Sequence, residues 1–111
     1  MEPQDFLPLT PVAFEILLSL GEGHQHGYAI MQAVNRSAAG RAVHPGTLYR
    51  AIARLVEESL LEELDGKGSG RRRIYALTQL GRDVAAAESA RLADQLDRAA
   101  AVLALKRPSR A

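Results

Sequence analysis

The stretch from His44 to Thr78 contains a helix-forming segment followed directly by a glycine-rich, basic hairpin. Pro45 suits the first position of a helix, because its ring fixes φ and that position needs no backbone N–H donor. The apolar residues that follow have the spacing of one buried helical face, namely Leu48, Ile52, Leu55 and Val56. The opposite face carries small, hydroxyl and arginine side chains, namely Thr47, Arg50, Ala53 and Arg54, with Tyr49 on the flank. Acidic residues appear only at the far end of this helix, as Glu57 and Glu58.

Two short strands, residues 60–65 and 72–77, are predicted after this helix. The residues that join them include Gly66, Gly68 and Gly70, and glycine permits the positive φ angles that a hairpin tip needs. The tip and the returning strand carry four cations, Lys67, Arg71, Arg72 and Arg73. A helix with a cationic first half, followed by a basic hairpin, is typical of a winged helix on double-stranded DNA. The helix would enter the major groove and the hairpin would contact phosphates, although a run of charge can also be a merely solvated face.

The remaining elements are predicted to be helical, with one exception. Thr10 and Pro11 predict a helix over residues 10–20, and a second helix is expected over residues 27–39. Residues 41–43 are predicted to add a short third strand to the hairpin. The fold class is therefore mainly α with a small β-hairpin (α+β), in which residues 10–78 form a winged helix-turn-helix domain.

A long helix over residues 79–105 is expected to mediate dimerisation. Its apolar residues repeat at the spacing of a helix-pair seam, namely Leu92, Leu96, Ala99 and Leu103. About two heptads are marginal alone, so a second subunit is the simplest partner. Phe14 and Leu18 lie off the core stripe of residues 10–20 and need another apolar surface, which also predicts a homodimer. Residues 1–9 are expected to form a loose arm, whose Phe6 and Leu7 would reach a partner subunit, and residues 106–111 a basic tail.

The positive charge is local, although the net charge is only +1. Residues 1–35 hold four acids and no Lys or Arg, whereas residues 36–56 hold four Arg and no acid. A local basic face suits nucleic acid. The absence of cysteine excludes disulfides and fits a reducing cytoplasm. No apolar run approaches the length of a membrane span, and no signal peptide is evident, so a cytoplasmic protein is expected.

Enzymatic chemistry finds no support in the sequence. There is no nucleophile with a positioned base, and the glycines at 66–70 precede a strand, whereas a dinucleotide-binding loop opens a helix. His24 and His26 are weak evidence for a metal site, since no carboxylate cluster or cysteine accompanies them. No metal or cofactor is expected.

Four sequence blocks in consecutive order resemble the PadR family of bacterial transcriptional regulators. They are LTPVAFEILLSL, HGYAIMQAV, PGTLYRAIARL and GRRRIYALT with LGR behind it, and they run from about Leu9 to Arg82. The resemblance implies a repressor that dimerises through its C-terminal helix and often responds to a small aromatic or hydrophobic effector. It also implies a DNA-contacting role for Tyr28. Ser59 departs from the family pattern, because a glycine usually ends the recognition helix there.

The candidate residues fall into two groups. Candidates for DNA contact are Tyr28, His44, Thr47, Tyr49, Arg50, Arg54, Lys67, Arg71 and Arg73. Candidates for a dimer interface or effector pocket are Phe14, Leu18, Leu92, Leu96, Ala99 and Leu103. His44 and Tyr28 have structural alternatives, as a helix cap and a packed corner residue. The alternative for the whole chain is a winged-helix protein-interaction module or antirepressor without an operator of its own.

Overall fold

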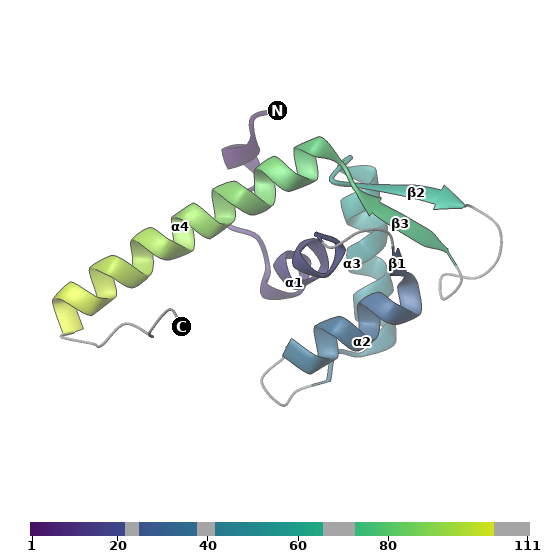
Figure 1. Ribbon diagram of the computed structural model, residues 1–111, viewed down its shortest axis with the longest axis horizontal. Coiled ribbons are helices and arrows are strands. Elements are labelled where there is room, and N and C mark those ends of the chain that lie inside the picture. Colours follow the sequence, from purple (N-terminus) through teal and green to yellow (C-terminus); the bar gives the residue numbers. More distant parts are fainter. Residues whose placement is uncertain (22–24, 38–41, 66–72, 104–111) are drawn as a thin grey trace.

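The computed structural model describes residues 1–21, 25–37, 42–65 and 73–103 of the 111-residue chain. In chain order the elements are η1 (Pro3–Phe6), α1 (Pro11–Leu20), β1 (Gln25–His26), α2 (Gly27–Ser37), α3 (Pro45–Glu57), β2 (Leu61–Asp65), β3 (Ile74–Leu77) and α4 (Gln79–Leu103). Helices α1, α2 and α3 pack beside a small antiparallel sheet, and the far half of α4 extends away from them (Figure 1). The mainly helical class with a small sheet is confirmed.

Helix α1 begins and ends where the sequence predicts. The hydroxyl of Thr10 accepts a hydrogen bond of 3.1 Å from the backbone N–H of Ala13, and Pro11 occupies the first helical position. This cap satisfies one of the N–H groups that the first turn of a helix leaves without a partner.

The sheet has the order β1-β3-β2, with both neighbouring pairs antiparallel. The predicted hairpin is confirmed: Leu61 lies opposite Leu77 and Glu63 opposite Tyr75. The register then shifts between Glu63 and Asp65, and the intervening Leu64 is 47% exposed. The tip of the hairpin lies outside the described residues.

The predicted third strand is wrong in position. The strand that pairs with the hairpin is β1, where Gln25 lies opposite Tyr75, whereas Ala42 and Val43 belong to no strand. Arg41 lies outside the described residues. The physical reason lies in Asn35 of α2, whose side-chain oxygen accepts a hydrogen bond of 2.8 Å from the backbone N–H of Val43. This bond ties the segment to α2 instead of the sheet.

Helix α3 ends in a turn closed by Ser59. Its φ of 64° lies in the left-handed region, as expected where the PadR pattern has glycine. The N–H of Ser59 bonds the carbonyl of Val56, and the N–H of Leu60 bonds that of Leu55, which together form a Schellman motif. The chain therefore accepts the strain of a non-glycine residue at this position.

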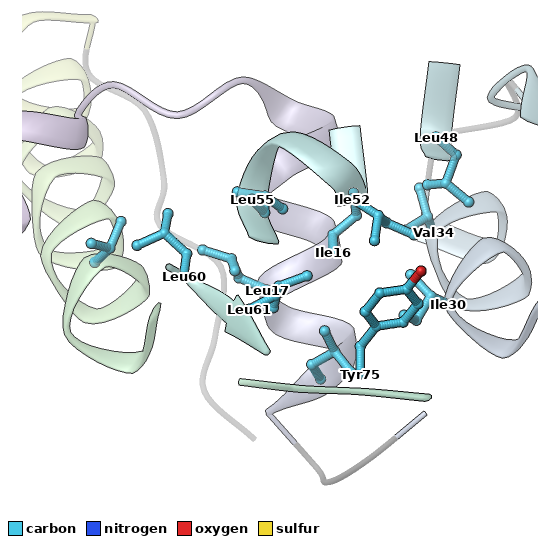
Figure 2. Packing of buried hydrophobic residues seen from close by; sticks show 12 residues of the cluster. Ile16, Leu17, Ile30, Val34, Leu48, Ile52, Leu55, Leu60, Leu61 and Tyr75 are labelled. Carbon is cyan, nitrogen blue, oxygen red and sulfur yellow. The ribbon is translucent and has the colours of Figure 1, made fainter. Parts of the chain in front are cut away.

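The core lies between α1, α2, α3 and the sheet. Its buried side chains converge from all of these elements, and α4 adds Val84 (Figure 2). The members are Ile16, Leu17, Leu20, Ile30, Val34, Leu48, Ile52, Leu55, Leu60, Leu61, Tyr75 and Val84. The predicted buried face of α3 is thus confirmed at Leu48, Ile52 and Leu55.

The N-terminal arm is not loose, which corrects the expectation from sequence. Its 3-10 helix η1 lies against α4, and Phe6, Leu7 and Leu9 pack against the chain's own core. The backbone N–H of Leu9 also donates a hydrogen bond of 2.9 Å to the carboxylate of Glu88 on α4. The apolar arm residues therefore find their cover within the same chain.

Helix α4 is confirmed from Gln79 to Leu103, and the residues beyond lie outside the described part of the chain. Thr78 caps it, since its hydroxyl accepts from the N–H of Gly81 at 2.9 Å and donates to the carbonyl of Ser59 at 2.7 Å. Gly81 is buried against the carbonyl of Leu60. The end of α3 and the start of α4 are thereby joined.

Candidate nucleic-acid interface

The N-terminus of α3 is capped by His44. Its Nδ1 accepts a hydrogen bond of 3.1 Å from the backbone N–H of Gly46, so the structural alternative for this residue is realised. Because Nδ1 acts as the acceptor, the neutral ring carries its proton on Nε2. This second nitrogen stays available as a hydrogen-bond donor at the exposed start of the helix.

The face of α3 opposite the core is exposed and cationic. Thr47, Arg50 and Arg54 are all exposed, in agreement with the helical periodicity of the sequence. Arg50 approaches the hydroxyl of Thr47, with 3.4 Å between Nη2 and Oγ1. Arginine presents several N–H donors in a fixed fork, which suits guanine edges and phosphates.

Tyr49 does not share this exposed face. Its hydroxyl is buried and has no hydrogen-bond partner in the structure. It lies beside a hollow of about 190 Å³ between α3 and the hairpin, which Tyr75 also lines. The structure therefore separates Tyr49 from Thr47 and Arg50.

Two of the arginines predicted to contact DNA, Arg54 and Arg73, each lie beside a glutamate. Nε of Arg73 lies 3.3 Å from Oε1 of Glu63, and Nε of Arg54 lies 3.7 Å from Oε1 of Glu58. Burial and the nearby charge of Glu63 raise the pKa of the Tyr75 hydroxyl, which Arg73 partly opposes. Sequence reasoning missed both pairs, although the spacing of Arg54 and Glu58 is that of neighbours on a helix.

The other predicted DNA contacts are distributed as follows. Tyr28 is the second residue of α2 and is 42% exposed. Lys67 and Arg71 lie outside the described residues. Arg73 immediately precedes β3, and its carbonyl accepts a hydrogen bond from the N–H of Gly27. The start of α2 and the base of the hairpin are thus held together.

The predicted dimer residues on α4 and α1 are incompletely covered in the single chain. Leu92 and Leu96 are each 38% exposed, Leu103 is 64% exposed and Leu18 of α1 is 46% exposed. Ala99 is half-buried. Val102, which sequence reasoning did not select, is 80% exposed.

A hollow of about 270 Å³ brings Phe14 and Leu92 together. Leu18 and Leu96 do not line it, so the structure unites only part of the predicted effector space. A larger hollow, of about 420 Å³, lies between the arm, α1 and α3, with Arg54 and Glu58 at its edge. Sequence reasoning gave no sign of this second space, because the arm that lines it was expected to be loose.

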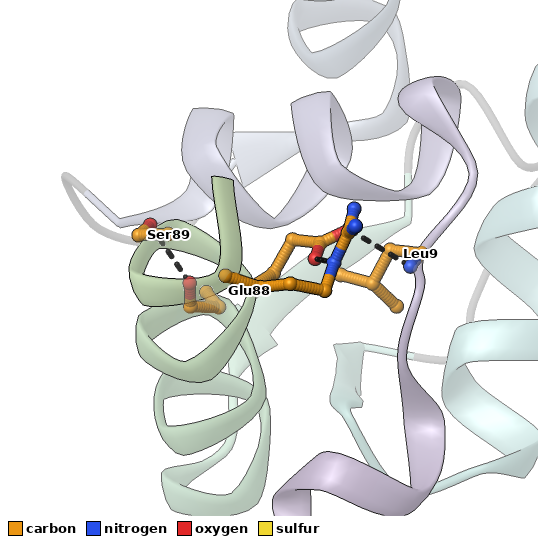
Figure 3. A network of polar contacts seen from close by, with 5 residues as sticks. Leu9, Glu88 and Ser89 are labelled. Carbon is orange, nitrogen blue, oxygen red and sulfur yellow. Dashed lines mark hydrogen bonds and ion pairs between the residues drawn. The ribbon is translucent and has the colours of Figure 1, made fainter. Parts of the chain in front are cut away.

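Glu88 is a buried carboxylate that sequence reasoning also missed. Its side chain is 2% exposed and accepts hydrogen bonds from Arg91 and from the N–H of Leu9 (Figure 3). The hydrogen bond from Arg91 is the main cause that lowers the pKa of Glu88, against the opposing effect of burial. In sequence this pair looks like any surface pair three residues apart on a helix.

Two further observations concern metals and membranes. Among the described residues, no group of three His, Cys, Asp or Glu side chains is placed to hold a metal ion. His24 lies outside the described residues, and His26 belongs to β1. Within the same part of the chain, no helix has the length and apolar character needed to cross a membrane.

The chain is similar to known proteins in sequence and in fold. It is 41% identical over 69 residues to the "Uncharacterized 37.1 kDa protein in transposon TN4556" of Streptomyces fradiae, a match that covers 62% of this chain but only 19% of that protein. It is 30% identical to RosR of H. salinarum, with a TM-score of 0.68 over 90% of this chain and 94% of that chain. A PadR family transcription regulator from Clostridium difficile shares the fold at 23% identity, with a TM-score of 0.72 over 85% of this chain and 99% of that chain.

Residues 16–87 match the family described as "Transcriptional regulator PadR-like family". This match spans the helices α2 and α3, the hairpin and the first part of α4. The resemblance seen in sequence is confirmed, and the matched family is one of transcriptional regulators. The chain belongs to the PadR-like family of transcriptional regulators.

Proposed function

We propose that this chain represses transcription as a homodimer, by placing the first half of α3 in the major groove of a pseudo-palindromic operator. The observation that carries this proposal is the outer face of α3, on which Thr47, Arg50 and Arg54 stand clear of the core. No acid interrupts the sequence between residues 36 and 56. Thr47 and Arg50 would contact base edges, because they lie nearest the helix N-terminus.

Phosphate contacts would come from residues around this helix. The candidates are Tyr28, His44, Arg54, Lys67, Arg71 and Arg73. His44 would donate from Nε2, since Nδ1 is engaged in the cap. Tyr49, whose hydroxyl is buried, would support the angle between α3 and the hairpin.

The homodimer would form through α4, with α1 contributing. Leu92, Leu96 and Leu103 expose apolar surface at the spacing of a helix pair, which favours a second copy of the same helix. Two-fold symmetry would place two α3 helices about one turn of DNA apart, or about 34–36 Å. The operator would then consist of two inverted half-sites.

A small hydrophobic or aromatic effector would bind at this interface and release the operator. The hollow that Phe14 and Leu92 line supports this part of the proposal. Leu18 and Leu96, which are partly exposed, would adjoin it in the dimer. If titration with hydrophobic compounds changes neither the melting temperature nor the DNA affinity, this effector site is wrong.

The proposal is tested by fluorescence anisotropy with the DNA upstream of the protein's own gene and with scrambled DNA of the same composition. Affinity for both should fall steeply between about 50 and 200 mM salt, with the upstream DNA bound more tightly. Arg73→Ala should flatten the logarithmic salt dependence by about 0.9 for both DNAs, which corresponds to one phosphate contact. Arg82→Ala, which removes an exposed arginine from the first turn of α4, is the matched control and should leave the slope unchanged.

The absence of binding even at low salt would favour the alternative, a protein-interaction module. The oligomeric state is tested separately by sedimentation of the free protein. Leu96→Asp should shift the dimer toward monomer, because it places a charge in the apolar seam. Ala90→Asp adds the same charge at an exposed position of α4 outside the seam and should leave the dimer intact.

A further inference from the structure

Arg54 and Arg73, which we assign to phosphate contacts, lie beside acidic side chains, whereas Arg50, which we assign to base contacts, does not. Arg73 and Arg54 each lie beside a carboxylate, that of Glu63 at 3.3 Å and that of Glu58 at 3.7 Å. Arg50 instead approaches a neutral hydroxyl, that of Thr47. In the free protein each of these two arginines thus already has an anionic neighbour, and a carboxylate oxygen is an acceptor of the same kind as a phosphate oxygen.

We propose that Glu63 and Glu58 compete with DNA phosphates for Arg73 and Arg54 and thereby limit the affinity of the protein for DNA of any sequence. This inference rests on the proposed function. Every DNA complex, specific or not, uses phosphate contacts, and non-specific binding consists almost entirely of them. An internal competitor at these contacts weakens all complexes by a similar factor and keeps the protein from persisting on non-operator DNA.

Glu63 is the stronger competitor of the two. The side chains of Arg73 and Glu63 are 42% and 25% exposed, whereas those of Arg54 and Glu58 are 79% and 36% exposed. A less exposed ion pair is screened less by water and salt. The Arg73 pair is also the shorter one, so its exchange for a phosphate has the larger energetic cost.

The surroundings of Glu63 increase this cost. Glu63 and Arg73 line the same hollow as Tyr49 and Tyr75, and Glu63 lies opposite Tyr75 in the sheet. When Arg73 turns to a phosphate, the carboxylate of Glu63 loses the neighbouring cation that compensates its charge. Near a DNA backbone that carboxylate also faces a second negative charge, which adds repulsion to the competition.

The test is Glu63→Gln, measured by anisotropy against operator and scrambled DNA over a range of salt concentrations. This substitution keeps the shape of the side chain and removes its charge. Affinity for both DNAs should rise by about two- to five-fold, with their ratio unchanged, because an exposed or half-exposed ion pair is lost from the free protein. Glu62→Gln is the matched control, because it removes the same charge from the preceding residue of β2. Glu62 is exposed and points to the opposite face of the strand.

A double-substitution cycle separates the competition from a general change of charge. In an Arg73→Ala background, Glu63→Gln should give no more gain than Glu62→Gln, since the arginine for which it competes is absent. Glu58→Gln provides an independent variant at the end of α3. It should raise the affinity in the same direction but less than Glu63→Gln does.

The outcomes are distinguishable. If the wild type binds DNA but Glu63→Gln changes the affinity no more than Glu62→Gln, the inference is overturned and the proposed function stands. A loss of affinity in a folded Glu63→Gln variant overturns it too, because Glu63 would then assist Arg73. If Glu63→Gln does not fold, an unchanged affinity in Glu58→Gln refutes the competition. A wild type that binds no DNA ends the proposed function and this inference together.

Discussion

Replacement of Gly81 by alanine should destabilise the protein, although helix propensity alone predicts the opposite. Gly81 is the third residue of α4, and alanine is favoured over glycine inside a helix by about 1 kcal/mol. A methyl group at this position would lie 2.1 Å from the carbonyl oxygen of Leu60 and 2.9 Å from Cδ1 of Leu77. Real Cβ atoms essentially never approach another heavy atom within 3.0 Å, so α4 has to move.

The movement breaks specific contacts. The carbonyl of Leu60 accepts a hydrogen bond from the backbone N–H of Thr78 at 3.2 Å, and at 3.0 Å it shares the hydroxyl proton of Thr78 with the carbonyl of Ser59. Overpacking against a fixed backbone costs about 1–3 kcal/mol, and a lost hydrogen bond costs about 0.5–1.5 kcal/mol more. After the gain of about 1 kcal/mol in helix propensity is subtracted, a net destabilisation of about 0.5–3.5 kcal/mol is expected.

The measurement is urea denaturation at one fixed protein concentration, because association of subunits also affects apparent stability. Gly46→Ala is the matched control in the first turn of α3. A methyl group there would meet side-chain atoms that can shift, Nδ1 of His44 at 3.2 Å and Nη1 of Arg50 at 3.3 Å, rather than backbone. It should therefore leave stability unchanged or raise it by up to about 1 kcal/mol. A Gly81→Ala protein as stable as the wild type would refute the docking of α4 on Leu60.

Substitutions at three further positions test local features of the fold. Ser59→Gly should raise the free energy of unfolding by about 0.5–1 kcal/mol, because the φ of 64° suits glycine; a loss of stability in denaturant titration would contradict the Schellman turn. His44→Ala should cost about 1 kcal/mol through loss of the α3 cap, whereas His44→Ser should retain most of it; equal losses in the two variants would exclude capping by the side chain. Glu88→Gln should be less stable than the wild type at pH 7 by about 1–2 kcal/mol, since a charge-assisted hydrogen bond to the N–H of Leu9 is weakened. The pKa of Glu88 is lowered in the folded state, so its contribution is full above the ordinary value of 4.5 and is lost as the pH falls through the folded-state value; a wild-type advantage that persists undiminished at about pH 2 would contradict this.

The helices and the hairpin were predictable because their signals are local. A capping residue followed by proline marks the start of two helices, at Thr10 with Pro11 and at His44 with Pro45. The apolar spacing from Leu48 onward predicts the buried face of α3. The strained turn at Ser59 followed from a single departure from the family pattern. Each of these features depends on residues within one or two turns of one another.

The errors concern contacts between segments far apart in the chain. The place of β1 in the sheet depends on pairing of Gln25 with Tyr75, and two residues carry no strand periodicity of their own. The N-terminal arm is held in place by the hydrogen bond from the N–H of Leu9 to the carboxylate of Glu88, a residue 79 positions further along the chain. The hydroxyl of Tyr49 is buried because the hairpin lies beside this part of α3. The periodicity of α3 alone gives no information on that contact.

The central claim, that α3 reads DNA sequence through its exposed first half, is tested most directly with Arg50→Ala. The DNA affinity of the Arg50→Ala variant should be compared with that of Arg82→Ala, both on the operator and on scrambled DNA. If the upstream DNA holds no operator, one is selected from a pool of random sequences. Arg50→Ala should lose about 1–3 kcal/mol on the operator and much less on scrambled DNA, so that its sequence preference collapses while that of Arg82→Ala persists. An Arg50→Ala protein that keeps the full preference of the wild type would contradict the account.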